Sequence, residues 1–222
     1  MRQPSRLLTN GRVAVLVVLA ILLIDQIIKI WVKTSMTLHE SIQITDWFYI
    51  AFIENNGMAF GMQLGSKIVL SLFRVIAISL LGYYILQEVR RGAKTGYIIC
   101  LSMVLAGAAG NLIDCMFYGL VFNESSPHYL SYFVPFGTGY APFLMGKVVD
   151  MFYFPLIETD WPQWMPVVGG EHFVFFSPVF NFADASISVS VVLLLLFYRK
   201  EISSISLSKA VEKKEEKEEQ VE

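Results

Sequence analysis

The sequence alternates long apolar runs with shorter polar stretches, and four of the runs are long enough to cross a lipid bilayer. A helix needs about 20 apolar residues to span the hydrocarbon core. Runs of that length fall at about 12–33, 68–89, 97–117 and 178–198. The chain is 55% hydrophobic and only 16% charged, whereas a soluble domain of this size carries more charge. The pattern predicts an α-helical polytopic membrane protein with four transmembrane helices.

The first apolar run follows three arginines, Arg2, Arg6 and Arg12, as the apolar core of a signal peptide would. It is too long for that assignment, contains Asp25 and Lys29, and lacks a clear small-x-small cleavage site. We therefore expect it to be a retained transmembrane helix.

Basic residues gather on one predicted side of the membrane: Arg2, Arg6, Arg12, Arg90, Arg91, Lys94, Arg199 and Lys200. Beyond the end of the first helix, the two long connections, 34–67 and 118–177, contain only Lys67 and Lys147. By the positive-inside rule, both termini are cytoplasmic and both long connections lie outside. The polar groups described below are therefore expected near the outer face of the membrane.

The charge of the chain is concentrated near its end. The formal net charge is −2, and the sequence closes on KKEEKEEQVE. We expect residues 1–200 to form one membrane-embedded domain and residues 201–222 to form a charged, disordered cytoplasmic tail. No basic patch interleaves with aromatic residues, so nucleic acid is not an expected partner.

The outer connections predict a small β-rich cradle and an enlarged loop region. Residues 42–62 alternate in part between apolar and polar positions, which indicates short strands, and we expect a hairpin turn at Asn55-Asn56-Gly57. Residues 118–177 are rich in aromatics, proline and glycine. Tryptophan and tyrosine favour the membrane–water interface, where we expect part of this segment to lie.

The fourth apolar run begins with Ser177 and Pro178, a favourable N-cap and first helical residue. With that start, Asp184 lies in the second turn, about 9 Å below the start of the helix at 1.5 Å per residue. An N-terminal cap would not account for a carboxylate at that depth.

Three of the predicted helices carry a pair of polar residues on one face toward their outer ends: Asp25 and Lys29, Asn111 and Asp114, and Asn181 and Asp184. Asp150 lies in the outer connection, within the apolar stretch GKVVDMFYF. The spacing i, i+4 explains Asp25 and Lys29 as an ion pair. Asn111 and Asn181 either form hydrogen bonds between helices or belong to a functional site. Burying a carboxylate in a membrane costs free energy unless it is paired. Several carboxylates at one depth therefore indicate a functional site.

Paired carboxylates suit an aspartic protease. Two held close together cannot both ionise, so they share a proton, and one activates water while the other protonates the substrate. Other chemistries lack their motifs: HExxH and GxSxG are absent, and His39, His128 and His172 are scattered. Cys100 and Cys115 are about 22 Å apart along one predicted helix, too far for a disulfide.

The order of the motifs resembles the lipoprotein signal peptidase (signal peptidase II) family, and the likeness covers nearly the whole chain. Five motifs carry it: DQIIK from Asp25, NNGMAF from Asn55, AGAAGNLIDCMFYG, GKVVDMFYF and FNFADAS. Each is weak alone, but five in order, combined with four predicted helices, are specific.

The resemblance implies a role for each matching residue. Asp150 and Asp184 would be the catalytic dyad, and Asn181 and Asn111 would orient the dyad or the substrate backbone. The remaining residues would support the site: Asp114, Asp25 and Lys29 by bracing helices, and Asn55 and Gly57 as part of a platform that grips the substrate.

The family removes signal peptides from bacterial prolipoproteins after a diacylglyceryl group has been attached to a cysteine, and it cuts just before that cysteine. The resemblance therefore implies diacylglyceryl-modified prolipoproteins and membrane lipid as partners. It also implies the bacterial cytoplasmic (inner) membrane as the location, with the active site near the outer face. It implies neither a metal nor an organic cofactor.

The sequence departs from the family in two ways. Cys115 stands where the family typically has arginine, and the connections 119–147 and 150–181 look longer than usual. The longer connections would form either a lid or substrate rim, or a surface insertion without a role.

Two alternatives keep the membrane fold and drop the peptidase. The first is a small proton-coupled carrier that uses Asp25, Asp114 and Asp184 as a relay. The second is a non-enzymatic scaffold whose polar groups only join helices. A scaffold would tolerate Asp→Asn changes, and it has no need of Asp150.

Overall fold

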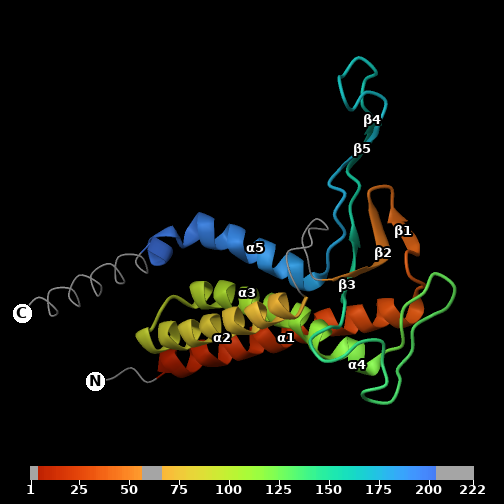
Figure 1. Cartoon of the computed structure of the whole chain (residues 1–222). Helices are drawn as coiled ribbons and strands as arrows, with labels where there is room; N and C mark the ends of the chain where they lie inside the picture. The colour runs from red at the N-terminus through yellow and green to blue at the C-terminus, as the bar shows by residue number, and fades with distance from the viewer. Residues whose placement is uncertain (1–4, 57–66, 204–222) are drawn as a thin grey trace, which may run out of the picture.

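A bundle of apolar helices forms the body of the molecule, and the strands and long connections lie toward one end of it (Figure 1). The computed structural model describes residues 5–56 and 67–203. Within those residues, three helical segments are long and apolar enough to span a membrane. Two of them are α1, Ser5–Ser35, and α2, Lys67–Arg91, which match the first two predicted runs.

The third spanning segment, Thr95–Val121, is built from consecutive parts. They are α3 (Thr95–Ile113), the π-helical turn η2 (Asp114–Tyr118) and the short α4 (Gly119–Val121). The segment packs against α1, α2 and α5 and is more buried than the other two spanning helices. A π-turn inserts an extra residue into a helix and is frequently found at functional sites; this one begins at Asp114.

The last apolar helix, α5, is Phe182–Phe197, shorter than the predicted 178–198. The predicted start at Ser177 and Pro178 is wrong. Phe180 exchanges backbone hydrogen bonds with Phe152, at 2.7 and 3.1 Å, which hold the preceding chain in an extended conformation. The helix therefore starts only after this pairing ends.

The C-terminal end of the described chain returns to the beginning of α1. Figure 1 shows the start of α1 and the end of α5 at the same end of the bundle. Residues 199–203 are helical, and Glu201 forms an ion pair with Lys94 at 2.7 Å. From residue 204 onward, the predicted charged tail lies outside the described residues.

Three antiparallel strands form a small sheet in the order β1-β2-β3: Ser41–Thr45, Phe48–Asn55 and Val148–Tyr153. The strands predicted in this region are present, and β1 and β2 are joined by a turn that was not predicted. Thr45 pairs with Phe48, so the hairpin turns at Asp46 and Trp47. Asn55 is still in β2, paired with Val148, because β3 extends the sheet on that side. The predicted turn residue Gly57 lies outside the described residues.

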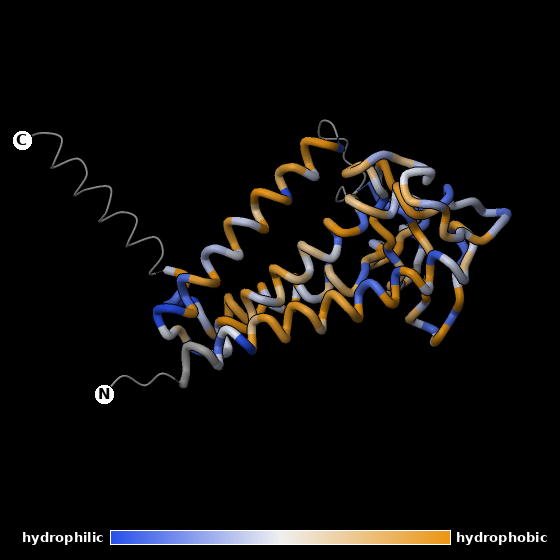
Figure 2. Tube along the Cα trace, turned by 90° about the horizontal axis from the view of Figure 1, so that it is seen from below, coloured by the Kyte–Doolittle hydropathy of each residue, from blue (hydrophilic) through white to orange (hydrophobic). Residues whose placement is uncertain are grey.

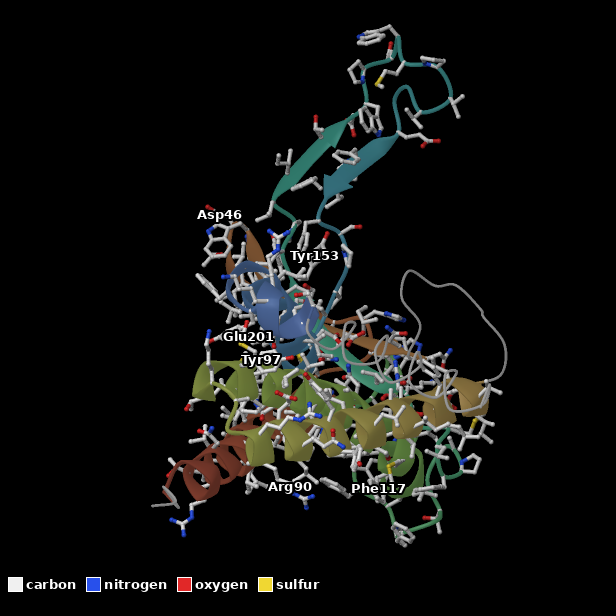
Figure 3. The ribbon with its side chains drawn as sticks, turned by 90° about the vertical axis from the view of Figure 1, so that its left-hand side faces the viewer. Asp46, Arg90, Tyr97, Phe117, Tyr153 and Glu201 are labelled. Carbon is white, nitrogen blue, oxygen red and sulfur yellow. The ribbon has the colours of Figure 1, made fainter. Side chains whose placement is uncertain are left out.

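A second, separate pair of strands stands away from the body. β4 (Ile157–Asp160) and β5 (His172–Phe175) form an antiparallel hairpin. In Figures 1 and 3 this hairpin projects away from the helices, and Tyr153 is labelled near its base in Figure 3. It lies between β3 and α5 in the chain, and so between the segments that carry Asp150 and Asp184.

The other long connection folds back onto the end of the third spanning segment. Backbone N–H groups of Val134, Gly137 and Ala141 donate to carbonyls of residues 119–121 at 2.8–3.0 Å. Phe122 is completely buried against this connection and the end of α1. The connection is therefore packed into the molecule.

The outward faces of the helices are apolar. Large side chains such as Leu16, Leu23, Phe73, Leu80 and Leu196 are all more than 60% exposed. In Figure 2, hydrophobic positions run along the helices, and hydrophilic positions gather near the end where the termini are marked. An apolar surface of this extent is expected of helices that face lipid.

Candidate active site

The first pair of candidate site residues, Asn181 and Asp184, lies at the start of α5. Asn181 is the N-cap: its side-chain oxygen accepts from the backbone N–H of Asp184 at 3.0 Å. Asp184 Oδ2 in turn accepts from the backbone N–H of Asn181 at 3.3 Å. This reciprocal capping box satisfies two otherwise free N–H groups. Asp184 therefore does cap the helix, and the expectation that a cap could not account for its position is wrong.

The second carboxylate comes from the buried strand β3. Asp150 is only 3% exposed. Its Oδ1 accepts from Asn181 Nδ2 at 2.7 Å, and its Oδ2 accepts from Asn55 Nδ2 at 3.2 Å. Burial, followed by the nearby charge of Asp184, raises the pKa of Asp150 to about 7, although the two amide hydrogen bonds act in the opposite direction. The two carboxylates therefore interact electrostatically.

A pair of amides joins the carboxylates to the helix bundle. Asn111 Nδ2 donates to Asp184 Oδ1 at 2.7 Å. The oxygen of Asn111 accepts from Asn181 Nδ2 at 3.0 Å and from Lys29 Nζ at 2.8 Å. The network thus runs from a buried lysine in α1, through Asn111 and Asn181, to both aspartates.

Lys29 is the centre of a fully buried ion cluster. Its Nζ lies 2.9 Å from Asp25 Oδ2 and 2.9 Å from Asp114 Oδ2, and all three side chains are 0% exposed. The predicted ion pair on one face of the helix is confirmed, and Asp114 joins it. Gln26, which the sequence analysis missed, donates to Asp114 Oδ1 at 3.0 Å and Asp25 Oδ2 at 3.2 Å. Its only sequence signal is a polar residue next to Asp25 in an apolar run.

The Lys29 cluster also holds backbone groups beside the two candidate catalytic residues. Asp25 Oδ1 accepts from the N–H of Ala183 at 3.0 Å, and Asp114 Oδ2 accepts from the N–H of Val149 at 3.3 Å. Ala183 precedes Asp184, and Val149 precedes Asp150. Gly110 permits this approach, because a Cβ there would lie 2.7 Å from Asp25 Oδ2. The cluster therefore fixes the backbone of both segments.

The sequence of this chain matches a known protein family. A sequence model of the family described as "Signal peptidase (SPase) II" matches residues 17–199. The chain belongs to the signal peptidase II family. The resemblance inferred from the five motifs is confirmed.

Named relatives of the signal peptidase II family cover most of the chain. The lipoprotein signal peptidase of Porphyromonas gingivalis is 49% identical over 197 residues, which is 88% of this chain and 87% of that protein. The lipoprotein signal peptidase of Amoebophilus asiaticus is 34% identical over 84% of this chain and 77% of its own length.

Solved structures share the fold. A bacterial membrane enzyme determined by the in meso method aligns with a TM-score of 0.57 and 22% identity, covering 86% of this chain and 90% of that structure. A second one, also described as a bacterial membrane enzyme, aligns with a TM-score of 0.56 over 84% and 92% of the respective chains.

Cys115, where the family resemblance led us to expect an arginine, has a cationic neighbour on another helix. Arg74 of α2 lies with its Nη1 3.3 Å from Cys115 Sγ. Asp114 is already paired with Lys29 and Gln26. A guanidinium is therefore present beside this position, although it comes from a different element.

A second buried cluster lies one helical turn beyond Lys29 and was not predicted. Lys33 is 0% exposed and lies 2.5 Å from Glu54 Oε1 and 2.7 Å from Ser125 Oγ. Lys147 Nζ lies 3.1 Å from Glu54 Oε2, without the geometry of a directed hydrogen bond. The rings of Phe52, Phe122 and Tyr140 surround Lys33 at 5.2–5.8 Å. These rings provide cation–π contacts in place of further hydrogen bonds.

Proposed function

We propose that this member of the signal peptidase II family is an aspartic endopeptidase with Asp150 and Asp184 as its catalytic dyad. One observation carries the proposal: Asn181 bonds both carboxylates, Asp150 through its side chain at 2.7 Å and Asp184 through its backbone at 3.3 Å. Carboxylates this closely linked favour a shared proton, because ionising both is costly.

The electrostatics support a resting state with the proton on Asp150. Its pKa is raised to about 7, so at neutral pH it is substantially protonated. Asn111 Nδ2 and the Asn181 backbone N–H donate to the two oxygens of Asp184 and hold this carboxylate in place. In the proposed reaction, Asp184 takes a proton from water as the water attacks the peptide carbonyl. Asp150 protonates the carbonyl oxygen, and the dyad then delivers a proton to the leaving amine.

We propose that the substrate is a prolipoprotein bearing a diacylglyceryl group, cut just before the modified cysteine. The relatives' name supports this class, and so does the depth of the site. The rise from the exposed Arg12 to Lys29, which is bonded to the dyad network, is about 26 Å at 1.5 Å per residue. Since the hydrocarbon core is about 30 Å thick, the site lies near a membrane surface, where a lipid-anchored peptide would present its scissile bond.

The membrane orientation follows from the charges at the other end. The start of α1 and the end of α5 lie together (Figure 1), and Arg12, Arg90, Arg91 and Lys94 belong to that end of the bundle. By the positive-inside rule, we assign that end to the cytoplasm and the dyad to the outer face of the inner membrane. In this arrangement α5 completes a four-helix bundle, and the β1-β2-β3 sheet forms the cradle outside it.

Purified protein in detergent, presented with a diacylglyceryl-modified lipobox peptide, tests the proposal. We expect the wild type to cut before the lipidated cysteine, and Asp150→Asn and Asp184→Asn to lose this cleavage. Asp46→Asn is the matched control, because Asp46 is exposed at the β1–β2 turn. Its activity should equal that of the wild type.

Folding has to be measured in parallel, because Asp184 also caps α5. In the Asp184→Asn variant, the amide oxygen of the new side chain can still accept the capping hydrogen bond, so the thermal unfolding midpoint should stay close to that of the wild type. Normal cleavage by both folded variants would overturn the aspartic mechanism. A folded wild type that cuts nothing would instead support the carrier or scaffold.

A further inference from the structure

The segment 156–176, which we name the finger, has two chemically different faces. Residues directly opposite in an antiparallel pair point to the same side, and side chains alternate along a strand. Ile157 pairs with Phe175 on one face, and Asp160 pairs with His172 on the other. Ile157 and Phe175 are 56% and 51% exposed, whereas Asp160 and His172 are exposed polar side chains whose Oδ1 and Nδ1 lie 3.0 Å apart in a hydrogen bond. The finger is therefore an amphipathic ribbon.

The tip of the finger is also apolar. Residues 161–170 read WPQWMPVVGG and contain no charged side chain. Trp164 is 80% exposed and Val167 is 97% exposed. Trp161 packs on Phe173 with ring centroids 4.8 Å apart, which stiffens the junction between tip and strands. A large indole is thus held at the far end of the ribbon without a protein surface over it.

The finger has no third strand in the described part of the chain, because the β4–β5 sheet contains those two strands alone. A two-stranded hairpin is marginally stable in water unless it packs against something else. An exposed apolar face together with an exposed tryptophan therefore indicates a surface that covers the finger in its working environment.

The position of the finger indicates which surface this is. It leaves the body directly after β3. Hydrogen bonds through Asn181 and Asn111 connect Asp150 of this strand to Lys29, so Asp150 lies at about the same depth as Lys29. That level is about 26 Å from Arg12 along α1 at 1.5 Å per residue, close to the limit of a hydrocarbon core about 30 Å thick. In Figure 1 the finger projects to the side of the helices and does not continue along them, so it extends sideways at this level, along the membrane surface.

We propose that the finger binds the lipid surface at the site end of the bundle, lying in the membrane–water interface beside the helices. The apolar face and Trp164 contact the boundary between headgroups and acyl chains, and the Asp160–His172 face contacts water. Tryptophan favours this interface because its ring is apolar and its N–H is polar. The inference depends on the membrane-spanning helices and not on the proposed dyad. Its consequence for the site is a second attachment to the membrane, inserted between the segments of Asp150 and Asp184.

Spin labels on the full-length protein, reconstituted in phosphatidylcholine vesicles, test this placement. The chain has two cysteines, Cys100 and Cys115, and both are buried, so a new exposed cysteine can be labelled selectively. Gln163→Cys places a nitroxide beside Trp164 at the tip, and His172→Cys places one on the charged face. Relaxation by oxygen, which concentrates in lipid, is compared with relaxation by a water-soluble nickel chelate.

We expect the label at position 163 to favour oxygen several-fold over the chelate, and the label at position 172 to favour the chelate. Adding Trp164→Ser to Gln163→Cys should shift the ratio toward the chelate, whereas adding Asp160→Asn, on the charged face, should leave it unchanged. A tip label that is open to the chelate would overturn the proposal. Protection of the tip label from both reagents would also overturn it, in favour of contact with a second copy of the chain.

Discussion

Two buried lysines, one turn apart on the same face of α1, differ in what they connect. Lys29 binds two aspartates and passes a hydrogen bond through Asn111 toward the dyad. Lys33 binds Glu54 and Ser125 and is enclosed by aromatic rings. The Lys29 cluster lies among the helices and the site, whereas the Lys33 cluster joins α1 to β2 and to the connection 122–146.

The two clusters also differ in the balance of positive and negative charge. The Lys29 cluster has one cation for two carboxylates, so its lysine has no substitute nearby. Around Glu54 there are two cations, Lys33 and Lys147, so either can neutralise the carboxylate if the other is removed. The first cluster is therefore expected to be required for the chemistry, and the second to attach an outer segment.

The largest expected effect is that of Lys29→Met. It leaves Asp25 and Asp114 buried without a cation, and breaking a buried ion pair costs about 3–5 kcal/mol. We expect a large fall in the thermal unfolding midpoint in detergent and loss of cleavage. Lys94→Met is the control, since Lys94 is 72% exposed in its ion pair with Glu201 and solvent screens such surface pairs strongly. An unfolding midpoint for Lys29→Met equal to that of the control would show that the cluster does not stabilise the fold.

Asn111→Ala tests whether the hydrogen-bond relay from Lys29 through Asn111 to Asp184 contributes to catalysis as well as to stability. It removes the hydrogen bond to Asp184, and hydrogen bonds to charged groups contribute about 1.5–3 kcal/mol. If that interaction acts on the ionised dyad in the transition state, kcat falls about 10–100-fold. Asn10→Ala is a matched control, because Asn10 is also buried and bonds Ala93 and Thr95 at the opposite end of the bundle. The two variants should lose similar stability, and only Asn111→Ala should lose kcat; equal activity losses would refute the relay.

The pH dependence of stability should differ in sign between Asp150 and Glu54. The pKa of Asp150 is raised to about 7, so its contribution is complete below its ordinary pKa and is lost as pH rises through about 7. Burial raises the pKa of Glu54, but Lys33 and Ser125 outweigh this effect and lower it below its ordinary value of 4.5. Its contribution is therefore complete above that ordinary pKa and is lost as pH falls through the lowered one.

Unfolding midpoints measured across pH check both signs. Asp150→Asn should flatten the alkaline side of the stability profile, and Glu54→Gln should flatten the acid side. Cleavage by the wild type should also fall as pH rises through about 7, because a dyad with both carboxylates ionised lacks the acid. If activity rose through this range, Asp150 would not be the proton donor.

Lys33→Met should have the smallest effect on activity. Lys147 still neutralises Glu54, so we expect a loss of about 1–3 kcal/mol, a change in kcat below tenfold, and easier proteolysis of residues 122–146. The double variant with Lys147→Met should lose more stability than the two single changes together. Strict additivity would show that the two lysines do not compensate for each other.

The Lys33 cluster also affects how the predicted lid can be tested. That the long connections form a lid or substrate rim stays a prediction. A deletion of residues 123–142 would remove Ser125 and Tyr140 together with any lid. Loss of activity in that deletion would therefore not distinguish a lid from the attachment of the outer segment, and Lys33→Met is the necessary comparison.

The sequence predicted those features that depend on local pattern. Long apolar runs located the three spanning helices, and i, i+4 spacing located the pairing of Asp25 with Lys29. The start of α5 was missed because the good local cap at Ser177 is overruled by backbone hydrogen bonds from Phe180 to Phe152 in β3. The Lys33 cluster was missed because Glu54 and Ser125 are 21 and 92 residues away from Lys33 in the sequence. No local sequence pattern predicts contacts over such separations.

The hydrogen bond from Ala183 to Asp25 joins residues 158 positions apart, in the last and first apolar helices. Asn181 and Asp184 start that last helix, so the proposed site is incomplete until α5 has entered the membrane beside α1. A nascent chain interrupted before α5 carries half of the dyad and none of its bridge. If Asp150 and Asp184 are the catalytic pair, activity therefore has to wait for the insertion of α5, and a chain interrupted before it is inactive.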